Sequence, residues 1–203
     1  MANRDLRIQR LSGQSINPYL DHLARLRIEI FREWPYLYEG SLEYEQKYLQ
    51  AFSRSPEAVV VLVSDGDEVV GASTGLPLEQ AEAAFQQPFI QRGDDVDKIF
   101  YLAESVLRQP YRGLGLGVRF FEEREAFARG LGRFETLAFC AVERPADHPH
   151  RPADYVVLDH FWRKRGYVKS PDLKSYYAWP DLGETTDSLK PMVFWLKSLD
   201  NAP

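Results

Sequence analysis

The sequence predicts an α/β fold with seven strands and four helices, and three patterns support this prediction. Short runs rich in β-branched and aromatic residues are typical of strands. Apolar residues that recur three and four positions apart indicate helices with one buried face. A glycine-rich turn joins a strand to a helix near the middle of the chain. Because 203 residues suffice for one sizeable core, we expect a single domain over residues 1–203.

The first part of the chain supplies three strands and two helices. Strands are predicted at residues 6–11, 58–63 and 68–74, and helices at residues 20–31 and 41–52. Asp65-Gly66-Asp67 separates two β-branched runs, and an Asp-Gly turn in that setting is a strong hairpin signal. The polar stretch 77–97 follows, with a short helix expected at 78–86. This insertion is either a lid over a site or ordinary surface.

Residues 99–129 form the centre of the predicted fold. A strand over 99–107 is stopped by Pro110, which lacks the N–H that a central strand needs, and a helix with an apolar face runs from Val118. The turn between them places glycines at alternate positions, namely Gly113, Gly115 and Gly117. Backbone N–H groups can therefore point into one concavity, onto which the positive end of the helix dipole also converges. We expect this turn to bind a phosphate or pyrophosphate.

The remaining third of the chain adds three strands and one helix. Strands are predicted at residues 134–142, 175–179 and 192–197, and a helix at residues 155–165 that Gly166 stops. A connection rich in proline and histidine, residues 143–154, precedes this helix. Its His148-Pro149-His150 sequence matches no zinc spacing with a defined second pair of ligands, so we expect no metal.

Composition excludes several classes of protein. The apolar share of 44% and charged share of 27% are those of a soluble globular chain, and no run approaches the ~18 to 20 apolar residues of a membrane span. A net charge of −5 offers no footprint for nucleic acid. One cysteine, Cys140, and a start without an apolar signal core favour the cytoplasm. We therefore expect neither nucleic acid nor a membrane as a partner. Whether the chain forms a homodimer is left open by the sequence.

Two well-known phosphate motifs are absent. The dinucleotide fingerprint G-x-G-x-x-G fails, because Val118 and Phe120 stand where its third glycine is needed. The P-loop pattern G-x-x-x-x-G-K-[ST] occurs nowhere in the chain. A nucleotide-dependent enzyme therefore conflicts with the sequence.

The turn does fit another pattern, R-x-x-G-x-G, read as Arg112-Gly113-Leu114-Gly115-Leu116-Gly117. It resembles motif A of the GNAT superfamily of acyl-CoA-dependent N-acetyltransferases. The order of elements is similar over nearly the whole chain, as are the segments Phe161–Tyr167 and Lys190–Trp195. The resemblance implies a central mixed, mostly antiparallel sheet of about seven strands, splayed at the acyl-CoA site and flanked by about four helices.

The resemblance also implies a cosubstrate, acetyl-CoA. Its pyrophosphate would sit on the backbone amides of Arg112, Gly113, Leu114, Gly115, Leu116, Gly117 and Val118. Its pantetheine arm would pair like an added strand with Val106, Leu107 and Arg108. The Arg108 side chain either reaches a phosphate or is simply solvated.

Direct acyl transfer needs a base and benefits from an acid. Glu104, on the central strand among apolar neighbours, is the expected base, since burial there would raise its pKa; the alternative is a structural carboxylate paired with an arginine. The family's usual tyrosine aligns with Trp162, whose indole N–H cannot act as an acid. Tyr155 is the expected replacement, with Cys140, His160 or no acid at all as alternatives.

Two segments are expected to contact the amine acceptor. Trp34, Tyr36, Tyr38 and Glu39 form an aromatic and acidic loop suited to a cation, unless these side chains only pack the helices on the sheet. Glu143 and His148 belong to the second segment, which is otherwise an ordinary polar loop. The predicted function is direct transfer of an acetyl or other acyl group to a primary amine in a ternary complex. The alternative is a non-catalytic acyl-CoA-binding or sensor module.

Overall fold

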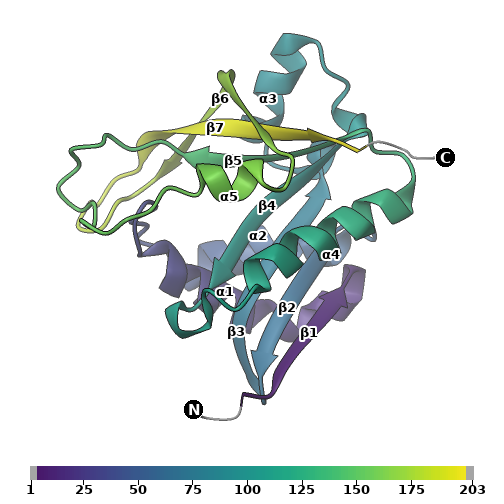
Figure 1. Ribbon diagram of the computed structural model, residues 1–203, viewed down its shortest axis with the longest axis horizontal. Coiled ribbons are helices and arrows are strands. Elements are labelled where there is room, and N and C mark those ends of the chain that lie inside the picture. The colour runs from purple at the N-terminus through teal and green to yellow at the C-terminus, as the bar shows by residue number, and fades with distance from the viewer. Residues whose placement is uncertain (1–3, 200–203) are drawn as a thin grey trace.

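A computed structural model describes residues 4–199 of the chain. Figure 1 shows a twisted seven-stranded sheet with strand order β1-β2-β3-β4-β5-β7-β6, in which only the β4–β5 pair is parallel. The strands are β1 (Leu6–Leu11), β2 (Val59–Asp65), β3 (Glu68–Pro77), β4 (Ile99–Leu107), β5 (Thr136–Val142), β6 (Val168–Trp179) and β7 (Ser188–Ser198). The α-helices are α1 (Leu20–Phe31), α2 (Leu42–Arg54), α3 (Ala83–Arg92), α4 (Leu116–Leu131) and α5 (Asp159–Arg163).

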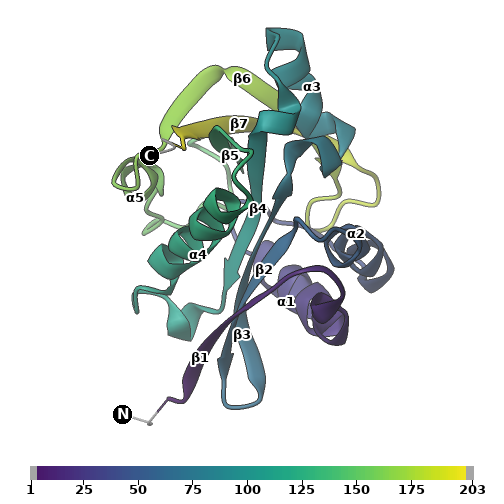
Figure 2. The same cartoon turned by 90° about the vertical axis from the view of Figure 1, so that its right-hand side faces the viewer.

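The helices cover both faces of the sheet. Figure 2 shows α1 and α2 on one face and α4 on the other. Each face has its own apolar core: Leu23 and Phe52 belong to the α1–α2 side, and Phe120 and Ala128 to the α4 side. Within residues 4–199, every helix is too short or too polar to cross a bilayer. The predicted mixed, mostly antiparallel sheet is confirmed.

Two of the predicted helices were wrong in their bounds. The helix expected at 78–86 is a short 3₁₀ turn, Leu78–Gln80, followed by α3, whose buried Phe85 and Phe89 lie one helical turn apart. The helix expected at 155–165 is only α5, Asp159–Arg163. The residues just before it are exposed, and adjacent β-branched valines without a core to pack on disfavour a helix.

Strand β4 contains a bulge that sets the geometry of the site. Thr74 pairs with Glu104 but Leu76 pairs with Tyr101, so two residue steps on β3 face three on β4. This extra residue reverses the alternation of side chains. Glu104 consequently faces α1 and α2, as Tyr101 does. Pairing between β4 and β5 also stops here, since Tyr101 opposite Ala138 is the last pair.

Arg124 of α4 holds this bulge from the opposite face. Its side chain is 1% exposed, and its guanidinium donates to the carbonyls of Thr74 and Glu104, both at 3.0 Å. The same group donates to the Ser105 hydroxyl at 2.9 Å and to the carbonyl of Phe120 at 3.0 Å. Burial lowers the pKa of Arg124 to about 10, which still leaves it cationic at neutral pH. The guanidinium thus satisfies carbonyls that the bulge would otherwise leave unpaired.

We expect Arg124→Met to destabilise the fold by roughly 3 kcal/mol or more, because it leaves several buried carbonyls without donors. Urea unfolding measures the loss. Arg129→Met on the same helix is the control: Arg129 is about half exposed and only pairs with Glu125 at 3.5 Å, so the change should cost less than about 1 kcal/mol. Equal losses in the two variants would show that Arg124 does not support the bulge.

Candidate active site

The glycine turn has the backbone that the sequence predicts. Gly113 and Gly115 adopt positive φ of 79° and 81°, a conformation that favours glycine. Helix α4 begins directly after Gly115, whose carbonyl accepts from the N–H groups of Val118 and Arg119. The N–H groups of Leu116 and Gly117 precede these and have no acceptor within the helix. The turn therefore presents unpaired amides at the positive end of α4.

The edge of β4 toward β5 is open beyond Tyr101. The Arg108 N–H donates to the Val70 carbonyl of β3 at 3.0 Å, and neighbouring residues of an antiparallel ladder direct their peptide groups to opposite edges. The peptide groups of Val106 and Arg108 thus face β3, whereas those of Ser105 and Leu107 face the open side. We call the gap between β4 and β5 beyond Tyr101 the splay. Of the three residues expected to pair with pantetheine, only Leu107 has main-chain N–H and C=O groups that face it.

Sequence reasoning missed Ser105. It is more exposed than any other residue of β4, including its neighbours Glu104 and Val106. The polar pair Glu104-Ser105 within a strand that is otherwise apolar is a signal that something other than core packs there. The bulge that turns the Ser105 peptide group outward cannot be seen in the sequence.

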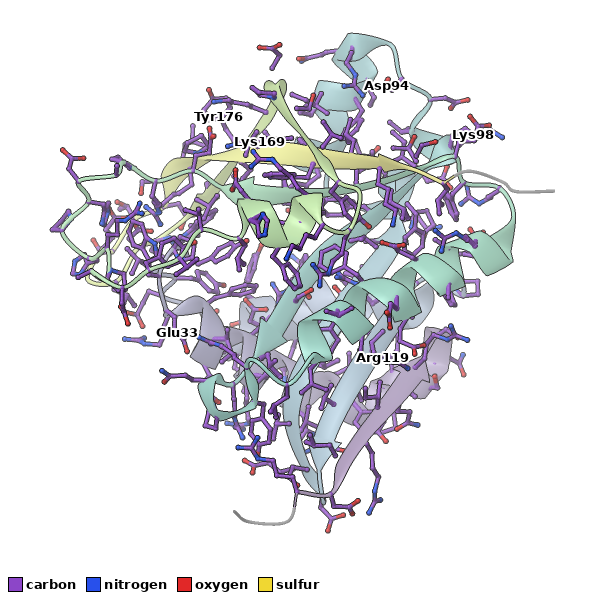
Figure 3. The ribbon with its side chains drawn as sticks, viewed as in Figure 1. Glu33, Asp94, Lys98, Arg119, Lys169 and Tyr176 are labelled. Atoms are coloured by element: carbon purple, nitrogen blue, oxygen red, sulfur yellow. The ribbon has the colours of Figure 1, made fainter. Side chains whose placement is uncertain are left out.

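Two arginines near the end of β4 are already engaged. Arg112 donates to the Leu107 carbonyl at 2.9 Å and to Glu33 at 2.7 Å. Figure 3 shows Glu33 beside the segment that leads into α4. Arg108 pairs with Glu29 at 2.9 Å and with Glu68, so its guanidinium is not simply solvated. A phosphate would have to compete with these carboxylates for Arg108.

Glu104 belongs to a buried network of charges. Its side chain is 7% exposed and ion-pairs with Arg27 of α1, while its other oxygen accepts from the Tyr48 hydroxyl at 3.1 Å. Arg27 also pairs with Glu45 of α2, which is fully buried. Burial acts to lower the pKa of Arg27, but the two carboxylates outweigh it and the pKa ends well above its usual value. Burial and Glu104 raise the pKa of Tyr48, which stays a protonated donor.

The candidate acids lie in three different surroundings. Tyr155 is in the loop before α5, with its ring 5.9 Å from that of Trp34, and burial raises its pKa. Cys140 is buried on β5, 3.1 Å from the Tyr101 hydroxyl. His160 is exposed on α5. Trp162, at the family's tyrosine position, packs its ring 5.1 Å from both Phe139 and Trp195.

The residues expected to contact an acceptor do not form one wall. Trp34 and His148 do meet, with ring centroids 5.0 Å apart, and Tyr155 joins them. Tyr36 and Tyr38 instead pack on Phe31, at 4.7 Å and 6.5 Å, as the packing alternative predicted.

Both expected carboxylates are occupied elsewhere. Glu39 pairs with exposed Arg32, and Glu143 pairs with Lys174 at 2.7 Å and Lys169 at 3.2 Å on β6. Hydrogen bonds from these lysines, Lys174 first, hold the pKa of Glu143 below its usual value. Figure 3 shows Lys169 over the β6–β7 pair. In the described part of the chain, no three His, Cys, Asp or Glu side chains gather as metal ligands.

Comparison with known families now identifies the class of protein. Residues 23–167 match the model of the Acetyltransferase (GNAT) family, so the chain belongs to that family. No curated protein matches the chain.

Solved structures show the same fold. Ribosomal-protein-alanine N-acetyltransferase from Brucella melitensis is similar with a TM-score of 0.61 at 15% identity, covering 95% of this chain and 99% of that one. An aminoglycoside 6'-N-acetyltransferase complexed with coenzyme A has a TM-score of 0.58 at 17% identity, and the match covers 96% of this chain and 99% of that one. An acetyltransferase from Streptococcus agalactiae 2603 has a TM-score of 0.57 at 18% identity, and the match covers 96% of this chain and 98% of that one. At these identities the likeness shows the fold and leaves the acceptor open.

We expect Cys140 to be unreactive in the folded protein. Burial raises its pKa to about 12, so at pH 8 only about one thiol in 10⁴ is ionised. Alkylation by iodoacetamide should be about 10³-fold slower than in the urea-unfolded chain, the matched control. Mass spectrometry gives both rates. Comparable rates would show that Cys140 is open to solvent or activated.

Proposed function

We propose that the chain, as one domain over residues 1–203, transfers an acetyl group from acetyl-CoA to a primary amine within a ternary complex. Family membership supplies the general class, an acetyltransferase. The observation that carries the proposal is the open β4 edge next to the glycine turn, because an extended thioester arm and its phosphates need both features in that order. We also propose that this activity takes place in the cytoplasm, because the one cysteine of the sequence, Cys140, cannot form an internal disulfide.

The proposed cosubstrate site combines the turn with this edge. The amides of residues 112–118 would hold the pyrophosphate, and Ser105 and Leu107 would pair with the pantetheine arm. Arg112 must then release the Leu107 carbonyl, which it now occupies at 2.9 Å. Its guanidinium would be free to approach the phosphates. The related aminoglycoside 6'-N-acetyltransferase solved with coenzyme A supports a cosubstrate of this kind.

The proposed chemistry uses Glu104 as the base. The amine nitrogen attacks the thioester carbonyl carbon, the C–S bond breaks, and the amine proton passes to the Glu104 carboxylate, directly or through Tyr48. Arg27 fixes the carboxylate on the side facing α1 and α2. Tyr155 is the proposed donor to the leaving thiolate. A chain of contacts connects Tyr155 with the end of β4. The Tyr155 ring packs near Trp34, which follows Glu33 in sequence, and Arg112 bonds both Glu33 and the Leu107 carbonyl of β4.

Gly115→Glu should abolish CoA binding, because its carboxylate would enter the anion concavity. Gly132→Glu is a matched control: both glycines have positive φ, 81° and 71°, and open space where a Cβ would be placed. Each variant therefore carries the same kind of backbone strain, but only Gly115 belongs to the turn. Calorimetric titration with CoA compares them. Unchanged affinity in Gly115→Glu would remove the turn from the phosphate site.

Glu104→Gln should leave CoA affinity nearly intact and lower turnover by about 10²-fold, the scale of a lost general base. Glu45→Gln is the control, since Glu45 also pairs with Arg27 but lacks the contact with Tyr48. Its turnover should fall only a few-fold. The rate of CoA release from acetyl-CoA, measured with a panel of amines, gives the turnover of both variants.

Equal losses in these two variants would show that Glu104 acts only through its ion pair. If the parent protein binds CoA tightly but releases CoA from acetyl-CoA only at the background rate with every amine, the non-catalytic acyl-CoA-binding module is favoured. Trp162 at the tyrosine position and the Arg27–Glu104 pair are the observations that support this second candidate.

A further inference from the structure

A pocket of 310 Å³ lies between α2 and residues 76–85. Helix α2 contributes Tyr44, Tyr48 and Phe52, the end of β3 and the insertion contribute Leu76 and Phe85, and β4 contributes Tyr101. Figure 2 shows α2 on the face of the sheet and α3 above it, near the end at which β4 starts. The insertion after β3 is therefore one wall of a pocket rather than plain surface.

Two side chains that line this pocket contact the two strands at the point where β4 and β5 separate. The Tyr48 hydroxyl donates to Glu104 of β4 at 3.1 Å, and the Tyr101 hydroxyl lies 3.1 Å from Cys140 Sγ of β5. Tyr48 therefore lies between the pocket and Glu104, and Tyr101 lies between the pocket and Cys140. An occupant whose reactive atom points inward would meet Glu104, the proposed base, by displacing or sharing the Tyr48 hydroxyl.

The walls of the pocket are aromatic and firmly held. Phe85 stacks on Tyr101 at 5.2 Å with an interplanar angle of 28°, and on Tyr177 at 4.9 Å with an angle of 21°. Phe52 packs on Tyr48 at 5.5 Å. Rings fixed in this way offer flat apolar surface at little cost in side-chain entropy. They suit a ring-containing body rather than a flexible polar chain.

Charge at the pocket is sparse. Glu82 lines it and accepts from the Tyr177 hydroxyl at 2.6 Å, and Lys47, of opposite sign, lines it too. Glu104 already pairs with Arg27. A polyamine or aminoglycoside carries several ammonium groups, each of which would need its own carboxylate or full hydration. An acceptor with one amine on an apolar body needs only one such partner.

We propose that this pocket holds the acceptor, and that the acceptor is a small primary amine on a compact aromatic body, with its amine directed toward Glu104. This rests on the proposed acyl transfer. A volume of 310 Å³ is at the small end of ligand pockets, which fits one ring and a short linker. A lysine side chain of a peptide is the competing occupant, and the experiment distinguishes the two.

The test uses 2-phenylethylamine, spermidine, kanamycin and a lysine-containing peptide as acceptors for the full chain with acetyl-CoA. We expect 2-phenylethylamine to have the highest kcat/KM. Ala81→Trp fills the pocket and should raise its KM by about 10-fold or more while KM for acetyl-CoA stays unchanged. Ala126→Trp, at an exposed position on α4, is the control and should change neither constant. Melting temperatures of both variants check folding.

The outcomes separate this inference from the proposed function. Preference for spermidine, kanamycin or the peptide, or an unchanged KM in Ala81→Trp, would overturn the pocket assignment while acyl transfer stands. Failure to bind CoA in calorimetry would overturn acyl transfer itself. If CoA binds but no amine is acetylated, titration of the CoA-loaded protein with 2-phenylethylamine decides: binding that Ala81→Trp weakens supports the pocket, and no binding overturns it.

Discussion

The open edge between β4 and β5 depends on a bulge in β4 and on the buried guanidinium that supports it. An extra residue in a central strand leaves carbonyls without ladder partners, and an unpaired buried carbonyl costs about as much as a lost hydrogen bond. Arg124 donates to the carbonyls of Thr74 and Glu104 and so offsets that cost. Without such a donor, regular pairing would be favoured, and the splay would tend to close.

Glu104 is held from both faces of the sheet. Arg124 binds its main-chain carbonyl from the α4 side, and Arg27 binds its carboxylate from the α1 side. A residue whose main chain and side chain are both held loses little freedom when a substrate arrives, which suits the proposed role of Glu104 as a base. On the opposite edge of the site, Arg112 joins the glycine turn to Glu33, next to the loop that carries Trp34. The glycine turn and the loop that follows α1 are thus in physical contact.

The sequence predicted the parts of the site whose signals are local. The bounds of β4 and the glycine turn follow from β-propensity, Pro110 and alternate glycines, all within a few residues of one another. The bulge did not follow, because it arises from pairing with β3, about 30 residues away in the chain. Ser105 at the open edge was missed for the same reason. The partner of Glu104 was foreseen only as some arginine, since Arg27 comes from a distant helix. The helix expected from Tyr155 failed because apolar periodicity cannot reveal that Val156 and Val157 have no core to pack on.

Amide hydrogen exchange, followed residue by residue by NMR with and without CoA, tests whether the open edge of β4 binds the cosubstrate. We expect new protection of the Ser105 and Leu107 amides, which face the open edge, and of the amides of the glycine turn. The Arg108 amide, already bonded to Val70 at 3.0 Å, serves as an internal reference that should change little. Protection confined to other elements, or none at the β4 edge when CoA is bound, would contradict the claim that the splay is the cosubstrate site.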